Sequence, residues 1–416
     1  MDNFDIVLAL SRMALNGDEV RVAHQVARLR NALNESSPKQ AEKLDKLLAR
    51  QKRRQDVAPM ALEQMRARPS GLQLPGEPLT RSTPLPTDRE TGAPLVRLLF
   101  PDDLDDPTPI LQPELAAAIS DQLREWDRVE DLARMGVKPN MRCLLYGAPG
   151  VGKTLLARFI GNRLRLPIVE ARLDGLISSF LGTTARNIGA LFDFADRYRC
   201  ILFLDEFDAI AKARDDSQEV GEIKRVVNTL LQCLDARNVQ GFTLAATNHE
   251  HLLDPAVWRR FEARIRIPRP DTGTRAAMLK RFLAPVSLSD SEIRMLLWLT
   301  DGMSGADLET LITGGKRYLV LHAGNTRTSR ARARPTREAL LSALRRQATL
   351  NARLFDEHRH QLLLRSDDAL LDALIEGAGL TQTEAAQVLG ISQSTVSRRL
   401  RSQEHEDARQ PEVSKE

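Results

Sequence analysis

The sequence predicts an α/β protein in which a parallel sheet is flanked by helices, with a helical lid and further helical segments at both ends. Two patterns lead to this fold class. Residues 141–146 are strand-like, and residues 200–204 are a short apolar run with the length of a buried parallel strand; a helical pattern over residues 155–164 follows the first of them. Toward the C-terminus, short helical patterns separated by glycine and polar turns replace the strands.

The bulk properties are those of a soluble protein. The chain has 416 residues, of which 42% are hydrophobic and 28% are charged, which is enough for two or three domains. No apolar run approaches the roughly 20 residues that a membrane span needs, and acidic Met1–Asp5 argues against a secretory signal. We therefore expect a cytoplasmic location and no membrane partner. Cys143, Cys200 and Cys233 lack metal-ligand spacing and fit reduced core thiols.

Composition divides the chain into segments. Ten of the 21 prolines lie between Pro59 and Pro109, which favours an extended linker. Residues 326–365 hold ten arginines and three acids, which suggests an anionic partner, although a solvated helix face has the same composition. The expected segments are a helical N-terminal bundle at 1–56, a Pro-rich linker at 57–95, a large α/β subdomain at 96–268, a helical lid at 269–345, an Arg-rich connector helix at 346–365, a helix-turn-helix at 366–404 and a disordered tail at 405–416.

A phosphate-binding loop follows the first predicted strand. Its pattern is Gly-x-x-x-x-Gly-Lys-Thr, and it stands between a strand and a helix as such loops require. Glycines let backbone N–H groups surround phosphate oxygens, the lysine reaches the β- and γ-phosphates, and the threonine hydroxyl binds Mg²⁺. We therefore expect ATP and Mg²⁺ as cofactors. The expected ATP-binding residues are Gly147, Ala148, Pro149, Gly150, Val151, Gly152, Lys153, Thr154 and Leu155.

Two carboxylates follow the second predicted strand. Asp205 and Glu206 come directly after residues 200–204, so they should lie at the carboxyl edge of the sheet, where ligands bind. Asp205 is expected to help hold Mg²⁺ together with Thr154. Glu206 is the candidate base that orients and polarises the attacking water.

Four further segments carry a family resemblance. They are residues 204–211, 243–248, 253–262 and 302–308. With the phosphate loop they resemble the AAA ATPase module over residues 120–320, so we expect an α/β P-loop AAA module. The resemblance implies that Asn248 positions the attacking water, and that Gly305 and Ala306 pack near the adenine.

Arg259 and Arg260 stand where members of this family carry arginine fingers that point into the neighbouring subunit's site. A second cation beside the γ-phosphate stabilises transition-state charge and contributes about 10³–10⁵ in rate. Adjacent arginines on a turn can instead be ordinary solvated charge. The resemblance implies a homo-oligomer, a hexamer in this family, in which hydrolysis depends on assembly.

A loop near residue 180 suggests the substrate. Residues 176–182 match the central-pore loop of the AAA family, in which an aromatic residue grips an extended polypeptide, and Phe180 followed by Leu181 takes that position. These parts imply remodelling or threading of a protein substrate.

No protease motif is present in the sequence, so proteolysis would come from a separate protein. The module resembles prokaryotic AAA proteins encoded beside subtilisin-like proteases, some of which act in antiviral defence.

Residues 382–400 predict a helix-turn-helix that resembles phage-repressor and Fis-like units. Gly390 makes the turn, Ala386 is small where two helices cross, and apolar residues such as Val396 fill the contact. A recognition helix near residues 392–401 would meet DNA; a helical hairpin for protein contacts is the alternative. The expected DNA-binding residues are Gln393, Ser394, Thr395, Ser397, Arg398 and Arg399.

Three functions fit this combination. The first is a ring-forming ATPase that remodels protein and is tethered to DNA or triggered by it. The second is an ATP-dependent DNA-binding regulator of transcription or plasmid maintenance. The third is a scaffold that binds ATP without hydrolysing it, and Glu206, Asn248 and the paired arginines argue against that hypothesis.

Overall fold

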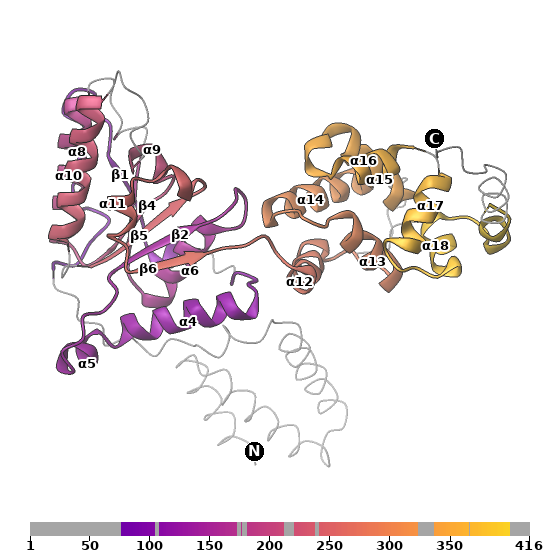
Figure 1. Cartoon of the computed structure of the whole chain (residues 1–416), viewed down its shortest axis with the longest axis horizontal. Coiled ribbons are helices and arrows are strands. Elements are labelled where there is room, and N and C mark those ends of the chain that lie inside the picture. The colour runs from indigo at the N-terminus through magenta and orange to yellow at the C-terminus, as the bar shows by residue number, and fades with distance from the viewer. Residues whose placement is uncertain are drawn as a thin grey trace, which may run out of the picture. The chain divides into compact units, whose positions relative to one another are not determined.

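The computed structural model describes residues 76–104, 108–172, 176, 181–211, 220–237, 241–322, 337–365 and 367–399 (Figure 1). The chain divides into two compact units, Met1–Gln64 and Met65–Glu416, and all described residues belong to the second. The predicted N-terminal bundle, the linker up to residue 75 and the C-terminal tail lie outside the described residues.

A six-stranded sheet forms the centre of the α/β part. Its order is β1-β3-β4-β5-β2-β6, and β1 runs antiparallel to β3 whereas the other neighbours are parallel. The predicted parallel sheet is therefore confirmed, and the antiparallel edge strand is an addition to it. The strands are β1 Val96–Leu99, β2 Arg142–Tyr146, β3 Ile168–Ala171, β4 Ile201–Leu204, β5 Phe242–Thr247 and β6 Ala263–Arg266.

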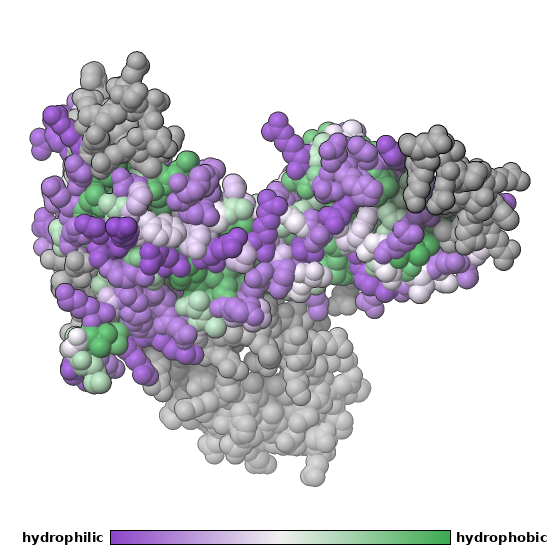
Figure 2. Space-filling model, viewed as in Figure 1, coloured by the Kyte–Doolittle hydropathy of each residue, from purple (hydrophilic) through white to green (hydrophobic). Residues whose placement is uncertain are grey.

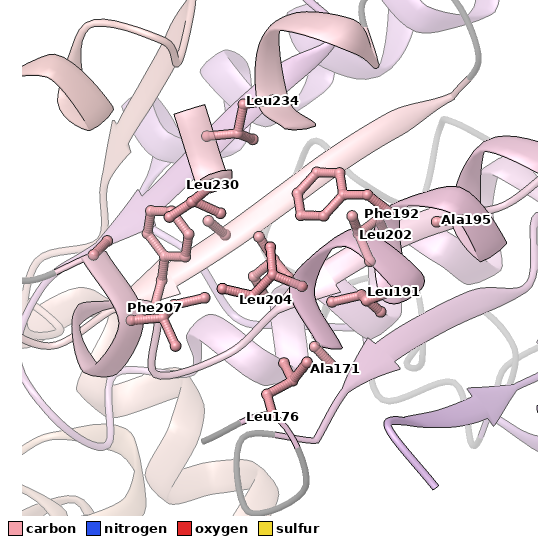
Figure 3. Packing of buried hydrophobic residues seen from close by; sticks show 14 of the residues in the cluster. Ala171, Leu176, Leu191, Phe192, Ala195, Leu202, Leu204, Phe207, Leu230 and Leu234 are labelled. Carbon is pink, nitrogen blue, oxygen red and sulfur yellow. The ribbon is translucent and has the colours of Figure 1, made fainter. Parts of the chain in front are cut away.

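Helices cover this sheet and bury it. Every residue of β4 and β5 is buried, as expected for strands that are covered on both faces. In Figure 3, Phe192 and Leu230 gather around Leu202 and Leu204 of β4. The helices are α4 Pro113–Asp127, α5 Val129–Arg134, α6 Lys153–Leu164, α8 Leu181–Arg197, α9 Asp208–Ala211, α10 Val220–Ala236 and α11 Pro255–Trp258, with 3-10 turns at Pro101–Asp103 and Glu250–Leu252.

Residues 76–95 lie against the α/β core, which corrects the predicted linker over 57–95. Leu79 and Leu95 are buried in the main core. The Asp88 carboxylate accepts hydrogen bonds from the Asn187 side chain and the Thr91 N–H, at 2.6 and 2.8 Å, and these bonds lower the pKa of Asp88 to about 2. The proline-rich segment thus folds onto the domain because it carries its own turn and apolar anchors.

The helical part begins after β6. Its first four helices, α12 to α15, are here called the lid. The predicted connector helix over 346–365 is not one helix: it consists of the end of α15, a 3-10 turn and α16, whose N-cap Asp356 accepts from the N–H groups of His358 and Arg359. The helices are α12 Thr272–Leu283, α13 Asp290–Leu299, α14 Gly305–His322, α15 Arg337–Leu350, α16 Glu357–Leu364, α17 Asp367–Glu376 and α18 Gln382–Leu389, and the 3-10 turn is Ala352–Leu354.

The surface is largely hydrophilic with small apolar patches (Figure 2). One apolar patch is visible near α5 in Figure 2, and Met135 and Val137, which follow this helix, are 81% and 52% exposed. None of the described helices is long and apolar enough to cross a membrane. Cys143 is buried, as expected for a core thiol, and burial raises its pKa to about 12.

Arg237 provides a test of the α/β core. Its fully buried guanidinium pairs with Asp196, and Arg237→Leu leaves this carboxylate and Thr243 without their partner. We expect a loss of about 3 kcal/mol in the free energy of unfolding, measured by urea denaturation; this is the low end of the range for a broken buried pair because Asp196 is 27% exposed. Arg225→Leu, at an exposed site on α10, is the matched control and should change stability by less than about 0.5 kcal/mol. Equal losses of unfolding free energy in the two variants would contradict the stabilising role given to the Arg237–Asp196 pair.

Candidate active site

The phosphate loop joins β2 to α6, and its glycines are required by their surroundings. Gly147 has φ +148°, and a Cβ there would lie 2.2 Å from the Ile267 carbonyl oxygen. Ile267 extends the β6 ladder, because its N–H donates to Tyr146 O at 2.8 Å. Gly152 has φ +99° and caps the N-terminus of α6. The loop therefore passes close to β6 and turns directly into the helix, as a phosphate cradle requires.

Lys153 and Thr154 begin α6. The buried Lys153 Nζ donates to the carbonyl oxygens of Gly147 and Ala148 at 2.7 and 2.9 Å. Burial lowers the pKa of Lys153, while the carboxylate of Asp205 acts in the opposite direction. The Thr154 hydroxyl donates to Asp205 Oδ2 at 2.6 Å. Two groups predicted from distant segments are thus in direct contact.

The oxygens of Thr154 and Asp205 fit Mg²⁺. This cation binds to proteins through one or two carboxylates, together with water and substrate phosphates. The described residues contain no cluster of three His, Cys, Asp or Glu side chains that could hold a metal alone. The donor set therefore suits an ion that arrives with a nucleotide.

Glu206 and Asn248 follow adjacent strands. Glu206 is exposed and has φ +47°, an uncommon conformation for a residue other than glycine. The next N–H, of Phe207, donates to Ala246 O of β5 at 2.8 Å and fixes this turn. Half-buried Asn248 comes directly after β5, and β5 pairs with both β4 and β2. Strained backbone of this kind is typical of functional positions.

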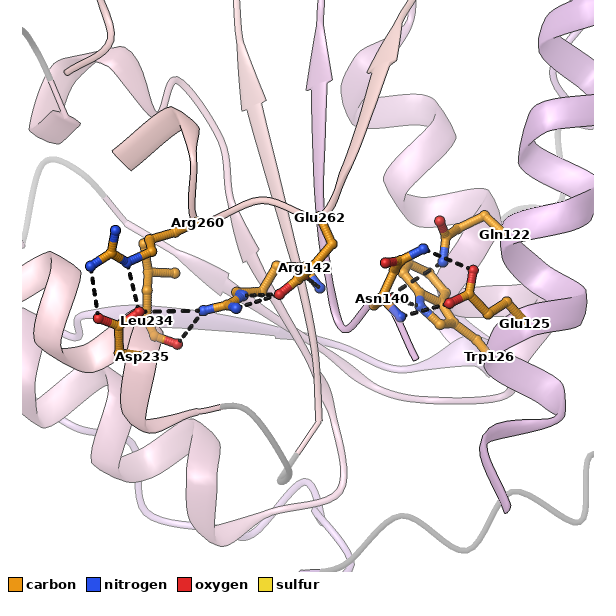
Figure 4. Close-up of polar contacts among 9 residues, drawn as sticks. All are labelled: Gln122, Glu125, Trp126, Asn140, Arg142, Leu234, Asp235, Arg260 and Glu262. Carbon is orange, nitrogen blue, oxygen red and sulfur yellow. Dashed lines mark hydrogen bonds and ion pairs between the residues drawn. The ribbon is translucent and has the colours of Figure 1, made fainter. Parts of the chain in front are cut away.

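The two predicted arginine fingers have different surroundings in the structure. Arg260 makes a bidentate contact with Asp235 of α10, at 2.8 and 3.1 Å, and this raises the pKa of its guanidinium (Figure 4). Beside it, Arg142 of β2 bonds Glu262 and donates to Leu234 O at 2.9 Å. Arg259 is exposed and pairs with no acid in the part of the chain that the structure describes. Of these two arginines, Arg259 can therefore reach a second molecule without breaking an ion pair among the described residues.

The lid contacts the phosphate loop at the start of α14. The Ala306 N–H donates to Gly150 O at 3.1 Å. Ser304 precedes α14, and its side chain is held by the carboxylate of Asp307 at 2.7 Å. Gly305 lies close enough that an added Cβ would be 3.6 Å from Gly150 O. Gly305 and Ala306 were predicted at this site from the sequence, but Ser304 was not; the signal for it is Asp307, three residues later, as in a helix N-cap.

Two predicted residues cannot be placed. Phe180 of the expected pore loop lies outside the described residues, and Leu181 begins α8 without a described side chain. Leu155, expected beside the nucleotide, is 38% exposed on the first turn of α6.

A helix-turn-helix follows α17. Thr381 caps α18 in a capping box with Glu384, and the helix ends at Gly390, which has φ +72°. Residues 393–399 form the next helix, with Val396 fully buried against the helices before it. The small residue, the turn glycine and the apolar anchor thus take the places that the sequence predicts.

The expected DNA-binding residues fall into two groups. Gln393, Ser394 and Arg398 are exposed, and Thr395 and Ser397 are half-buried. Arg399 forms an ion pair with Asp368 of α17 at 2.9 Å, a contact that its place in the sequence did not indicate.

Two family models match the chain. The model described as the ATPase family associated with various cellular activities (AAA) matches residues 143–269. The model described as winged helix-turn-helix DNA-binding matches residues 363–402. The two matches cover the phosphate-loop half and the C-terminal helices, respectively.

Known relatives agree with the first match. An uncharacterized AAA family ATPase of Sinorhizobium fredii is 38% identical over 232 residues, which are 54% of this chain and 67% of that protein. A proteasome-activating nucleotidase of Thermococcus kodakarensis is 35% identical over 214 residues, and the chain spans 53% of its length. The crystal structure of the FIGL-1 AAA domain has a TM-score of 0.50 at 22% identity, covering 67% of this chain and 89% of that one, which supports the fold.

Gly150 tests the contact between loop and lid. Gly150→Ala would place a Cβ 2.6 Å from Ser304 Oγ at a residue whose φ is +76°. Such strain costs about 1–3 kcal/mol, so we expect ATP affinity to fall about tenfold or more in a titration with a fluorescent ATP analogue. Gly189→Ala is the control, since a Cβ there meets no described atom within 4 Å. Unchanged affinity in Gly150→Ala would show that the lid does not close on this loop.

Proposed function

We propose, from the premise that this chain belongs to the AAA family of ATPases and hydrolyses ATP, that it acts as a ring which remodels a protein substrate. The observation that supports the proposed ring is the exposure of Arg259. Within one chain, the described site holds the phosphate-binding Lys153, the Asp205 carboxylate and the candidate base Glu206. We infer that the second cation is Arg259 of a neighbouring copy.

Each residue has a defined task in the proposed reaction. Thr154 and Asp205 would hold Mg²⁺, which would neutralise phosphate charge when bound. Glu206 accepts a hydrogen bond from the attacking water and polarises it, and Asn248 fixes the direction of attack. Arg259 of one subunit enters the next subunit's site and stabilises the transition-state charge. Arg260 positions this turn through Asp235 of α10.

A polypeptide is the substrate class that the relatives support. Several of them are proteasome-activating nucleotidases, in organisms such as Thermococcus kodakarensis and Pyrococcus furiosus. In the proposed ring, which we take to be a hexamer, Phe180 and Leu181 grip an extended chain. A separate protease, of subtilisin-like type as the resemblance implies, would degrade what the ring unfolds, and antiviral defence is the proposed setting.

DNA is the second proposed partner. The match to a winged helix-turn-helix and the exposed side chains of Gln393, Ser394 and Arg398 support this assignment. Thr395 and Ser397 lie beside them on the same short helix. We give Arg399 a different task from the other residues, because its ion pair with Asp368 fixes the recognition helix to α17.

One alternative has support of its own. The helix-turn-helix match also fits an ATP-dependent DNA-binding regulator of transcription or plasmid maintenance. The two functions differ in the ligand that should accelerate ATP hydrolysis, because a remodelling ring is coupled to polypeptide and such a regulator is coupled to DNA.

ATPase assays with each ligand separate these functions. We expect an unfolded polypeptide to raise the turnover of the full chain several-fold, and duplex DNA alone to raise it less. Glu206→Gln is the control that removes the base: it should retain ATP binding and lose about 10²–10⁴ in turnover. Stimulation by duplex DNA without any by polypeptide would favour the regulator.

A further inference from the structure

The lid and the helix-turn-helix share one hydrophobic core. One continuous cluster of buried side chains contains residues from both the lid and the C-terminal helices. In Figure 1 these are the orange and yellow helices from α12 to α18. Members from the lid include Leu296, Leu299 and Leu344, and members from the helix-turn-helix include Ala385, Leu389 and Val396. A domain on a flexible tether would have a core of its own.

Close contacts fix the orientation of the two parts. Arg294 of α13 forms an ion pair with Glu384 of α18, the same glutamate that completes the N-terminal capping box of that helix. At Gly377, after α17, an added Cβ would lie 2.5 Å from Trp298 Nε1 of α13. The α13 helix of the lid is therefore closely packed against α18 and the turn at Gly377.

A second set of contacts leads from α16 to the phosphate loop. Arg359 donates to the carbonyl oxygen and to Oδ2 of Asp301, both at 3.1 Å, and its guanidinium lies over the Trp298 ring. Asp301 also accepts from Arg275 of α12 at 2.8 Å. Five residues later, Ala306 donates to Gly150 O in the phosphate loop. The α16 helix, which precedes α17 and the helix-turn-helix, thus contacts Asp301, and the chain from Asp301 to Ala306 leads to the loop that is expected to hold the nucleotide.

We propose that the lid and the helix-turn-helix move as one rigid body, so that the nucleotide in the phosphate loop sets the affinity for DNA. A change in phosphate occupancy acts on the loop at Gly150 and shifts the balance of lid positions through Ala306. Because the recognition helix belongs to the same body, its presentation to DNA changes with the lid. Linkage is reciprocal, so bound DNA changes nucleotide affinity by the same factor. This inference rests on the proposed DNA binding.

DNA affinity of the full chain in two nucleotide states tests the coupling. The probe is a fluorescent duplex of about 12 base pairs carrying one half-site, selected from a random library by the full chain; it is too short to join two recognition helices. We expect the dissociation constants with ADP and with a non-hydrolysable ATP analogue to differ about tenfold, within the usual range of allosteric coupling. Saturating duplex should change the affinity for the analogue by the same factor.

Arg359→Ala should reduce this difference to less than about twofold, since it removes the link to Asp301. Arg353→Ala is the matched control: it removes the same charge from an exposed site that pairs with no acid in the described part of the chain, and it should keep the full difference. Arg294→Ala gives a second, independent break at the α13–α18 contact. Nucleotide-free DNA affinity equal to the wild type shows that a variant remains folded.

The possible outcomes separate the two proposals. Equal DNA affinity in both nucleotide states of the wild type overturns the coupling and leaves DNA binding in place. A full difference in both Arg359→Ala and Arg294→Ala overturns the proposed route. Failure of the full chain to enrich any duplex overturns DNA binding itself, and the coupling with it.

Discussion

Three parallel strands in the order β4-β5-β2 are the constraint on which the rest of the catalytic site depends. The carboxyl ends of parallel strands meet at one edge of a sheet, so the groups that follow them are brought together. The phosphate loop follows β2, Asn248 follows β5 and Asp205 follows β4. The hydrogen bond between Thr154 and Asp205 closes this arrangement across the central strand. Helices on both faces keep it buried and rigid, and the strained turn at Glu206 directs the base from the same edge.

The proposed reaction needs one group that the described site of a single chain does not supply. A second cation near the γ-phosphate accelerates phosphoryl transfer by about 10³–10⁵. Arg260 is committed to Asp235, next to the contact between Arg142 and Glu262, so it serves the shape of the subunit. Arg259 projects from the same turn without such a commitment among the described residues. A pair of adjacent arginines thus divides into one structural and one available residue.

Much of this site could be predicted because its residues act through local spacing. The phosphate loop, Asp205 and the turn at Gly390 follow from short patterns whose geometry is set by a few neighbouring residues. Contacts between distant segments could not be predicted in this way. The pair Arg399–Asp368, the burial of Leu79 and Leu95 in a proline-rich segment, and the core shared by lid and helix-turn-helix depend on how separate elements meet. Periodicity predicts an apolar face, but it does not say which other face will cover it.

The most direct test of the account asks whether hydrolysis is completed between subunits. Arg259→Ala and Lys153→Ala should each be inactive alone, because one lacks the finger and the other lacks the phosphate lysine. In a mixture, a subunit with an intact phosphate loop can sit beside one with an intact Arg259. About a quarter of the sites in a random one-to-one ring are then complete, so ATPase activity should return to a measurable fraction of the wild type. A mixture as inactive as its two components, although it assembles, would contradict the account.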